Sequence, residues 1–532
     1  MMENLTKWAY FSLLLYSCST LASFDPNVQV FKIVPENPTE NSTYRIFVNL
    51  ASSLHECEEK FLSVTIDSYS VKMRWSEFNF TSEKLQNLAA ALAPCDIRLG
   101  GTYADFLIFD PHGTNYSESK QTQDIYENDD RFYSGFSNPP VHLDNFTMTG
   151  EHWDILTTFL ATVGWDLLFD FNLFLWKDGV WDPSNADLLL NYSSQRDIKI
   201  PYFQLGNEPN SYQHNFNLTI SPETLVEDFR ILKKLISKYP LYNTSLLYGP
   251  DVTNLNVPHG AVQYLTDFLS SGAYDVVAGI SLHHYYLNGR IATLGQFLNI
   301  TVLNSMKSLL QLAIDIDKLS PRQLPILLTE TSSCFGGGAP GLSDAYISGF
   351  LWLNKLGLSA QYGVSRVFRQ TFLGGTYGLL DPSMRPNPDY FVSVVFKRLI
   401  QGPVFNVSTN PPDPQLRVFA HCARKNIYQA GDLVIYYLNL QDKYVNLDLP
   451  QFQHADLDLY LFTPGDDAGL KSRYVRLNGK LLVMPGNTLP PLTPKPHRGT
   501  VTVSPTSFGF IVVPNFNVTL CVKYFADLPD QK

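Results

Sequence analysis

The sequence predicts an α/β fold, namely a (β/α)8 TIM barrel with an attached C-terminal antiparallel β-sandwich domain. Eight short apolar runs recur between residues 61 and 371, and segments with a helical pattern lie between them. Two of these runs end on a glutamate followed at once by loop-forming residues. A parallel barrel presents its functional side chains at this point, the carboxyl end of a strand. After Leu399 the pattern changes to short extended runs separated by turn residues, which indicates antiparallel strands.

The eight apolar runs are the predicted barrel strands. Their starts are about 33 to 47 residues apart, except for a gap of about 70 residues between the second and the third. A strand with its crossover helix needs roughly 30 residues or more, so the spacing fits a parallel barrel. The predicted strands are Phe61–Asp67, Asp96–Gly101, Asp166–Asn172, Tyr202–Glu208, Leu246–Asp251, Gly279–Tyr285, Ile326–Glu330 and Val364–Thr371.

The connecting segments read as helices, with one exception. Ser82–Ala93 is rich in alanine and leucine, and Ser221 and Pro222 open an amphipathic stretch with a cap residue and a first-turn proline. The exception is the long gap at residues 111–150, which is rich in Asn, Asp, Ser, Gly and Tyr and has no clear periodicity. It is predicted to be a surface insertion, a lid or a processed linker.

The predicted domains follow from these changes of pattern. Residues 1–23 are a signal peptide, 61–398 the catalytic barrel and 399–532 the β-sandwich, while 24–60 contribute strands such as Val28–Val34 and Tyr44–Leu50 to the sandwich. Cys422 and Cys521 both fall in the sandwich and form the first candidate disulfide. Cys57 and Cys95 precede neighbouring barrel strands and form the second, which leaves Cys334 over. Spacing alone does not decide the connectivity.

The N-terminus predicts entry into the secretory pathway. Lys7 precedes a mostly apolar run at 8–16 that is too short to span a bilayer, and we expect cleavage after Ala22 or Ser23. No second long apolar run or hydrophobic C-terminal tail is present, so we expect no stable membrane insertion. Ten Asn-x-Ser/Thr acceptors beyond the signal favour a secreted glycoprotein. They are Asn41, Asn79, Asn115, Asn145, Asn191, Asn217, Asn243, Asn299, Asn406 and Asn517.

Charge and composition exclude some partners. A net charge of −11 gives no general attraction to nucleic acid, and a polyanionic substrate would need local basic patches. No Cys or Cys/His spacing indicates zinc, so neither a metal nor a cofactor is expected.

Glu208 and Glu330 are the candidate catalytic residues. Glu208 stands in Gln-Leu-Gly-Asn-Glu-Pro-Asn at the end of the fourth strand, and Glu330 ends the seventh. Two carboxyl groups that face one glycosidic bond suffice to hydrolyse it, one as acid and base and the other as nucleophile, and Asn207 is suited to hold the sugar 2-hydroxyl. A lone strand-end glutamate is as well explained by a surface ion pair. Asn-Glu-Pro together with the second glutamate favours catalysis.

Two further segments bear on a sugar site. Ser281–Arg290 ends the sixth strand, where a tyrosine can hydrogen-bond the nucleophile while histidines and Arg290 line the cleft. Neighbouring residues on a strand point to opposite faces, so one of the paired histidines is expected to pack in the core. Gly336, Gly337 and Gly338 follow Glu330 closely, and this loop is either an anion-binding turn or a flexible connection.

The strings QLGNEPNSY, SLHHYYLNGR, LLTETSSCFGGGAP and FLWLNKLGLSA resemble glycoside hydrolase family 79, the heparanase-like endo-β-glucuronidases. FLSVTID, DIRLGGTYADFLIFDP and TLPPL extend the resemblance over nearly the whole mature chain. It implies retaining hydrolysis of internal glucuronide bonds and secretion towards the extracellular matrix or lysosome. It also implies that Glu208 is the acid/base and Glu330 the nucleophile. The implied substrate-binding residues are Asp67, Thr102, Asn207, His283, Tyr285, Arg290, Gly336, Gly337 and Tyr377, the last three around the glucuronate carboxylate.

Departures from the family pattern concern basic residues and the linker. Residues 251–260 contain no lysine or arginine, and His214 stands where a lysine is expected. The 111–150 segment is shorter than the linker excised in the family, so a single retained chain is as well supported as two chains. Heparan sulfate proteoglycan is the expected substrate, and hyaluronan is the alternative within the family. A non-catalytic glycosaminoglycan-binding protein is a third hypothesis, which the presence of both glutamates disfavours.

Overall fold

The computed structural model describes residues 42–113, 143–257 and 260–528. The predicted signal peptide, the predicted strand Val28–Val34, the acceptors Asn41 and Asn115 and most of the predicted insertion lie outside these ranges.

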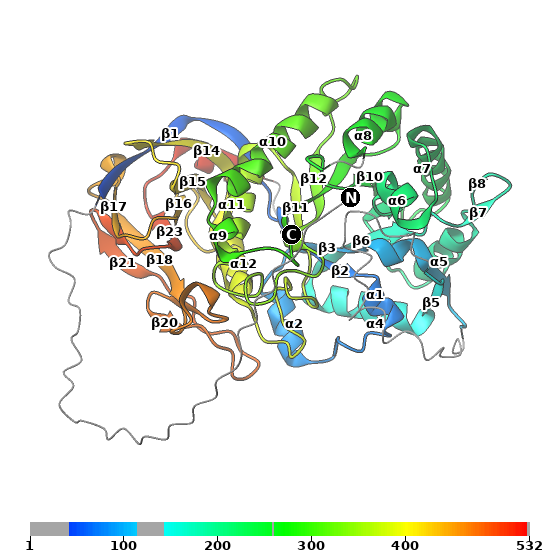
Figure 1. Ribbon diagram of the computed structural model, residues 1–532, viewed down its shortest axis with the longest axis horizontal. Helices are drawn as coiled ribbons and strands as arrows, with labels where there is room; N and C mark the ends of the chain where they lie inside the picture. Colours follow the sequence, from blue (N-terminus) through cyan, green and yellow to red (C-terminus); the bar gives the residue numbers. More distant parts are fainter. Residues whose placement is uncertain (1–41, 114–142, 258–259, 529–532) are drawn as a thin grey trace, which may run out of the picture. The chain divides into compact units, whose positions relative to one another are not determined.

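Eight parallel strands of the described chain close into a barrel (Figure 1). Neighbouring strands follow the chain order, and the last strand pairs with the first. The barrel strands are β2 (Leu62–Asp67), β3 (Cys95–Gly100), β6 (Trp165–Phe171), β9 (Tyr202–Leu205), β10 (Leu246–Val252), β11 (Gly279–Asn288), β12 (Ile326–Phe335) and β13 (Arg366–Arg369). Each overlaps one predicted strand, so the barrel prediction is confirmed. The strands are buried along nearly their whole length because helices cover the outside of the barrel and side chains fill the inside.

A helix follows each barrel strand before the next begins. These helices are α2 (Glu83–Ala90), α4 (Gly150–Val163), α5 (Ser184–Ser194), α7 (Pro222–Ile236), α8 (Ala261–Ser270), α10 (Ile300–Asp317), α11 (Ser348–Gln361) and α12 (Pro388–Leu399). Ser221 caps α7 by accepting a hydrogen bond from Thr224 N–H, and Pro222 takes the first helical position, as the sequence indicates. Helix α2 ends sooner than predicted, at Ala90, and Ser82 is its cap rather than its first residue.

Shorter elements fill the loops at the barrel ends. They are α1 (Tyr69–Lys72), α6 (Tyr212–Phe216), α9 (Leu294–Phe297), the hairpin β7 (Trp176–Lys177) and β8 (Val180–Trp181), and 3-10 turns at Thr102–Phe106, Pro209–Ser211, Ala273–Asp275, Pro450–Phe452 and Gly469–Lys471. One strand lies inside the segment predicted to be irregular. β5 (Phe146–Thr149) pairs in parallel with β4 (Leu107–Asp110), and Thr149 then caps α4. Met148 is fully buried, which anchors this short strand.

The second domain is one curled sheet of eleven strands in the described residues. Its strands are β1 (Ser42–Cys57), β14 (Ile400–Asn410), β15 (Leu416–Ala423), β16 (Leu433–Asn439), β17 (Val445–Asp448), β18 (Asp456–Pro464), β19 (Val475–Leu477), β20 (Lys480–Leu481), β21 (Lys495–Arg498), β22 (Val501–Val503) and β23 (Ser507–Val513), and α13 (Thr519–Asp527) follows. The N-terminal strand β1 lies between β14 and β17, as Figure 1 shows in blue among later strands. Its pairing with β17 is parallel, whereas the other pairs of this sheet are antiparallel.

Alternation along the central strands gives the sheet two apolar faces. In β16, Ile435 and Tyr437 pack into the core of the sheet domain, whereas Tyr436 and Leu438 join the core that includes the barrel. Side chains of a strand alternate between faces with period two, so a continuously apolar strand serves both cores. The sheet thus packs against the barrel through a buried apolar interface.

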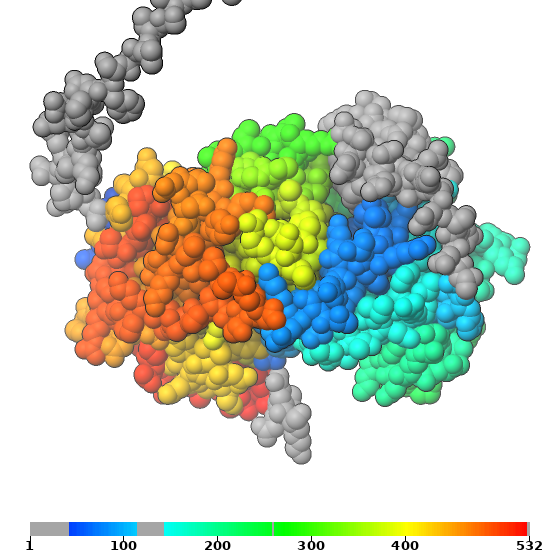
Figure 2. All heavy atoms as spheres, turned by 90° about the horizontal axis from the view of Figure 1, so that it is seen from below, coloured from blue at the N-terminus to red at the C-terminus, as the bar shows by residue number. Residues whose placement is uncertain are grey.

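Helix α11 lies in this interface and is buried on all sides except at its last residue. A Cβ on Gly349 would come within 2.4 Å of Cζ of Phe508, and one on Gly357 within 2.4 Å of Cε1 of Phe419. The two glycines therefore allow the sheet to approach the helix backbone. Figure 2 shows part of the sheet domain (orange) against the first barrel segments (blue). Asn87 Nδ2 donates a hydrogen bond to the carbonyl of Asn487 at 2.8 Å.

Cys422 of β15 and Cys521 of α13 form a disulfide with a Cα–Cα distance of 5.5 Å. The second candidate disulfide is not formed: Cys57, Cys95 and Cys334 are all free, buried thiols. No helix in the described part of the chain has the length and apolar composition needed to cross a bilayer.

Candidate active site

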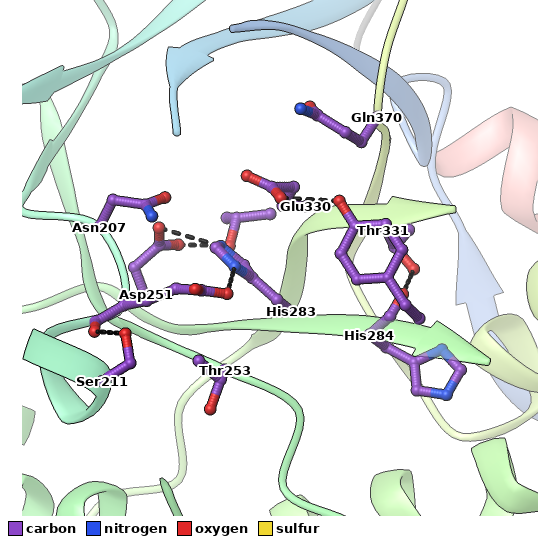
Figure 3. Close-up of polar contacts among 12 residues, drawn as sticks. Asn207, Ser211, Asp251, Thr253, His283, His284, Glu330, Thr331 and Gln370 are labelled. Atoms are coloured by element: carbon purple, nitrogen blue, oxygen red, sulfur yellow. Dashed lines mark hydrogen bonds and ion pairs between the residues drawn. The ribbon is translucent and has the colours of Figure 1, made fainter. Parts of the chain in front are cut away.

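Both glutamates lie at the carboxyl end of the barrel and share a histidine neighbour. Glu330 of β12 is opposite His283 of β11 in the sheet, and His283 Nδ1 is 2.8 Å from Oε1 of Glu208. Figure 3 shows His283 between Asp251 and Glu330, whereas His284 is turned away from them. The barrel thus brings together two carboxylates whose strands are separated by β10 and β11.

Glu208 lies in the turn after β9 and has a left-handed backbone conformation. Its φ of 56° and ψ of 50° are costly for a residue with a side chain. Its N–H donates to the Asp251 carbonyl at 3.0 Å, and its carbonyl accepts hydrogen bonds from the N–H and the hydroxyl of Ser211. Gly206 before it has a φ of 82°, and a Cβ there would lie 2.6 Å from Cδ2 of Leu173. The Gly-Asn-Glu-Pro sequence therefore forms a tight, heavily bonded turn.

Arg98 of β3 is a buried guanidinium that joins the polar groups of the site. Its Nη1 donates to Oε2 of Glu330 at 3.0 Å and its Nη2 to Oδ2 of Asp251 at 2.6 Å. Its other acceptors are Gln204 at 2.7 Å, Asn207 at 2.8 Å and Asp170 at 3.2 Å. Burial alone would lower the pKa of Arg98, but the nearby carboxylates of Asp251, Asp170 and Glu330 raise it above its ordinary value. The group therefore stays charged and fixes one oxygen of Glu330.

His283 holds a proton between two carboxylates. Nε2 is 3.0 Å from Oδ2 of Asp251, while Nδ1 faces Glu208. Burial by itself would lower the pKa of His283, but the charges of Asp251 and Glu330 outweigh it and raise the pKa to about 10. Burial by itself would raise the pKa of Asp251, but the charges of Arg98 and His283 hold this pKa below its ordinary value. At neutral pH an imidazolium therefore donates one N–H to Asp251 and one to Glu208.

Tyr285 occupies the second oxygen of Glu330. Its hydroxyl donates to Oε1 at 2.7 Å, so each oxygen of Glu330 accepts one hydrogen bond. Burial and the neighbouring Glu330 charge raise the pKa of Tyr285 well above its usual value, so the hydroxyl keeps its proton. The ring stacks on Tyr377 with centroids 6.4 Å apart.

Asp67 ends β2 on the same rim and is partly exposed. Burial raises the pKa of this carboxyl to about 7, and the charge of Glu330 adds to the rise. Nε2 of Gln370 lies 3.5 Å from both Oδ2 of Asp67 and the hydroxyl of Tyr377, so these two predicted binding residues are neighbours.

The remaining predicted site residues lie in loops at this end. Thr102 opens the 3-10 turn after β3. Gly336 and Gly337 follow β12 with φ of 78° and 77°, and the carbonyl of Gly337 accepts from Thr376 N–H at 2.7 Å. Arg290 is exposed after β11. Among the described residues, no hydrogen bond connects Thr102 or Arg290 to either glutamate.

Several residues of the site were not predicted from the sequence. Arg98 and Asp251 form its centre, Gln204 donates to Oδ1 of Asp251 at 2.6 Å, and Thr329 does so at 2.5 Å. Asp105, whose pKa burial raises to about 7, accepts hydrogen bonds from Tyr212 and from the Asn207 N–H. A charged residue inside an apolar strand run was the available signal for Arg98.

The two neighbouring histidines have different surroundings. The ring of His284 packs edge-on against Tyr286 at 4.7 Å, and burial lowers its pKa well below the ordinary value. No group of three or more His, Cys, Asp or Glu side chains in the described chain is arranged to hold a metal ion.

The barrel, the attached sheet and the paired carboxylates define a glycoside hydrolase. Residues 44–357 match the N-terminal domain of glycosyl hydrolase family 79, and the chain belongs to this family. It is 38% identical over 502 residues to heparanase of Bos taurus, an alignment that covers 88% of this chain and 91% of that protein. It is 34% identical over 486 residues to a hyaluronoglucuronidase of Hirudo nipponia, with 87% and 96% covered.

Solved structures show the same fold at low sequence identity. A 4-O-α-L-rhamnosyl-β-D-glucuronidase from Fusarium oxysporum superposes with a TM-score of 0.63 at 14% identity, over 88% of this chain and 100% of that one.

Proposed function

We propose that the chain is a retaining endo-β-glucuronidase that cleaves internal glucuronide bonds of heparan sulfate, with Glu208 as acid/base and Glu330 as nucleophile. One observation carries this proposal. An unbroken path of hydrogen bonds runs from Glu208 through His283, Asp251 and Arg98 to Glu330. It connects two carboxylates at the barrel end where such enzymes bind substrate.

The surroundings of the two glutamates support their different roles. A nucleophile must hold one carboxylate oxygen towards the anomeric carbon, and both oxygens of Glu330 are fixed by hydrogen bonds, one from the Arg98 guanidinium and one from the Tyr285 hydroxyl. Glu208 accepts from His283 on Oε1, which leaves Oε2 to carry a proton to the leaving oxygen. Its side chain is 25% exposed, compared with 14% for Glu330, so it remains accessible to water.

The reaction then has two displacement steps. Oε2 of Glu208 gives its proton to the glycosidic oxygen while a carboxylate oxygen of Glu330 attacks the anomeric carbon, so an ester forms and the glycosidic bond breaks. In the second step Glu208 removes a proton from water, whose oxygen attacks the same carbon and releases Glu330. Two inversions give net retention.

The glycine loop and Tyr377 support recognition of a uronate. Positive φ at Gly336, Gly337 and Gly338 permits backbone N–H groups to point at an anion. Thr376 N–H donates to the Gly337 carbonyl, which holds the loop beside Tyr377.

Heparan sulfate is the first candidate substrate because heparanases stand among the relatives with 38% identity. Hyaluronan is the second, because the hyaluronoglucuronidase relative is 34% identical and residues 253–257 after β10 contain no basic side chain. A sulfated chain needs cations, whereas hyaluronan carries only its carboxylates.

Aryl β-glucuronides test the enzyme assignment. We expect turnover by wild type, no measurable turnover by Glu330→Ala and a loss of about 10²- to 10⁴-fold for Glu208→Ala. The Glu208→Ala loss should be smallest for a dinitrophenyl leaving group, which needs no proton. Glu227→Ala on the exposed side of α7 is the control. A glycosylated, folded wild type that turns over no glucuronide would instead be a binding protein.

A substrate panel tests the finer assignment. Heparan sulfate, heparin, hyaluronan and chondroitin are incubated with the enzyme, and the products are sized. Internal cleavage of heparan sulfate to fragments supports the proposal, and release of terminal monosaccharide alone contradicts the endo mode. Rising salt should slow cleavage of a sulfated chain because it screens exposed charges.

We also propose that the protein passes through the secretory pathway. All eight Asn-x-Ser/Thr acceptors in the described residues have exposed asparagines, and the Cys422–Cys521 disulfide fits an oxidising compartment. A shift in mass on treatment with an N-glycosidase tests this.

A further inference from the structure

Strand β12 contains one extra residue next to the proposed nucleophile. Leu328 is opposite Leu282 of β11, but Glu330 is opposite His283, so Thr329 has no partner there. The pairing of β12 with β13 is shifted at the same place, between Leu328 and Thr331. A bulge of this kind interrupts alternation and redirects side chains, and bulges are frequent beside active sites.

The bulge turns two consecutive side chains to the inside of the barrel. Thr329 donates to Oδ1 of Asp251, and Glu330 accepts from Arg98. In an unbroken strand, one of these two side chains would point outward. The aim of Glu330 therefore depends on the bulge being held.

A lysine holds the outer side of this bulge. Lys355 of α11 is fully buried, and its Nζ donates to the His284 carbonyl at 2.9 Å, to the Ser332 carbonyl at 2.7 Å and to the hydroxyl of Thr331. Thr331 in turn donates to the His284 carbonyl. Thr331 and Ser332 directly follow Glu330 in β12. His284 lies between His283 and Tyr285 in β11. One side-chain nitrogen thus joins both strands beside the site.

The lysine itself cannot move far. Its Nζ lies 4.8 Å from the ring centre of Tyr286, and α11 is fixed between the barrel and the sheet by the close packing at Gly349 and Gly357. All three acceptors are uncharged oxygens, and burying an ammonium without a paired charge is costly. Burial lowers the pKa of Lys355 well below its usual value.

We propose that Lys355 is a positioning residue that locks the β12 bulge and thereby aims Glu330 at the anomeric carbon. The inference rests on the proposed role of Glu330 as nucleophile. Lys355 contacts backbone and Thr331 rather than substrate, so it acts through the strand.

The chain offers a matched control at the opposite end of the barrel. Lys397 of α12 is also buried, and its Nζ donates to the carbonyls of Glu59, Leu62 and Pro94 at 3.1, 2.8 and 2.7 Å. Leu62 begins β2 and Pro94 precedes β3, so these contacts are at the amino ends of strands. Lys355→Met and Lys397→Met remove the same chemistry, one beside the site and one far from it.

Kinetics of the two variants on an aryl glucuronide test the inference. Both are expected to lose thermal stability. At a temperature where both are folded, Lys355→Met should lower kcat about 10- to 100-fold with little change in KM, because a misplacement of 1 Å can cost about 100-fold. Lys397→Met should keep its kcat within about twofold. Equal effects on kcat in the two variants would overturn the proposal.

A second measurement separates positioning of Glu330 from general damage. Azide can replace the missing nucleophile in Glu330→Ala. If Lys355 acts only through Glu330, the azide-supported rate of Lys355→Met/Glu330→Ala should match that of Glu330→Ala within about threefold. A further loss of ten-fold or more would contradict the assignment.

Should Lys355→Met not fold, Thr331→Val removes one bridging hydroxyl and should lower kcat in the same direction, by about 3- to 10-fold; an unchanged kcat would contradict the inference.

The structure of Lys355→Met separates this inference from the proposed function. A wild type without glucuronidase activity would reject the function alone. A Lys355→Met crystal structure in which Thr329 stays unpaired and Tyr285 still donates to Glu330 at 2.7 Å would reject the role of Lys355, whatever the substrate.

Discussion

Tyr285 donates to one oxygen of Glu330 while Arg98 occupies the other. We expect Tyr285→Phe to lower kcat on an aryl glucuronide about 10- to 100-fold, because a hydrogen bond to a charged group contributes about 1.5–3 kcal/mol. The loss of this contact affects the attack more than binding, so KM should change little. Steady-state kinetics at one pH measure both constants.

The neighbouring tyrosine provides the control for this variant. Tyr286 accepts a hydrogen bond from Asn354 at 3.0 Å, and in the described residues no hydrogen bond joins it to either glutamate. Tyr286→Phe should keep kcat within about threefold. A drop as large as that of Tyr285→Phe would show that the effect comes from packing and not from the bond to Glu330.

The charge on His283 makes stability depend on pH. In the folded protein its pKa is raised to about 10, whereas an unfolded histidine titrates near 6.5. Between these values the folded state holds the extra proton, so its stability falls as pH rises. The stability advantage of wild type over His283→Gln should be largest below pH 6.5 and disappear towards pH 10. Denaturant unfolding at several pH values measures it.

His284 predicts the opposite trend. Burial lowers its pKa well below the ordinary value, so the folded state holds it neutral. The contribution of neutral His284 to folding stability is present above the unfolded pKa near 6.5 and is lost as the pH falls. The stability difference between wild type and His283→Gln and that between wild type and His284→Gln should therefore change with pH in opposite directions. A change in the same direction would contradict the assignment of the two environments.

At the scale of residues, the sequence predicted the side chains that strand-end motifs mark. Glu208, Asn207, Tyr285 and Glu330 lie together at the carboxyl end of the barrel, as those motifs indicate. Arg98 was missed because the residues beside it in β3 do not indicate that four other strands contribute hydrogen-bond acceptors to it. These acceptors come together only when the barrel has closed.

The disulfide is a covalent restraint between two elements of the sheet domain. It ties β15 to α13 across a sequence separation of 99 residues. We expect Cys422→Ala/Cys521→Ala to lose about 2–5 kcal/mol of unfolding free energy, mainly because the unfolded chain gains freedom. Equilibrium unfolding in urea measures the loss.

Reduction supplies the control for this pair. A reducing agent should bring the wild-type unfolding midpoint down to that of the double variant and leave the variant itself unchanged. Cys334→Ala removes a buried thiol that bridges nothing, so it should keep the sensitivity to reductant. A reductant-insensitive wild type would contradict a stabilising disulfide.

At the scale of elements, the barrel strands were predictable from short apolar runs at regular spacing. The bulge in β12 was not, because it depends on Lys355 from a helix and Asp251 from another strand. The strand β5 was also missed, since four residues with one buried side chain leave no periodicity to detect.

The two domains share one apolar interface, which predicts how the whole molecule unfolds. Phe508 of the sheet stacks on Tyr346 at 4.8 Å and lies against Gly349 of α11. Phe508→Ala should cost about 3–5 kcal/mol because it leaves a cavity between the domains. Loss of activity and loss of sheet structure on heating should still coincide, as measured by residual turnover and circular dichroism.

An exposed phenylalanine is the matched control. Phe47 of β1 is 38% exposed, and Phe47→Ala should change the stability by about 1 kcal/mol or less. Separate transitions for the barrel and the sheet in wild type would contradict a shared core.

For the whole molecule, the change of pattern at Leu399 was enough to predict a barrel with an attached β-domain. The sequence did not reveal that the domain is one continuous curled sheet or that β1 runs parallel to β17. Strand order depends on pairing between distant segments, and alternation within one strand carries no information about its neighbour.

The place of β1 has a consequence for biosynthesis. This strand leaves the ribosome before any part of the barrel, yet both of its partners, β14 and β17, are translated after the barrel is complete. Throughout that interval the nascent chain carries a long strand with unpaired edges, which invites association with other chains. A polypeptide truncated after α12 would lack both strands that pair with β1. We expect cellular quality control to degrade such a truncated chain.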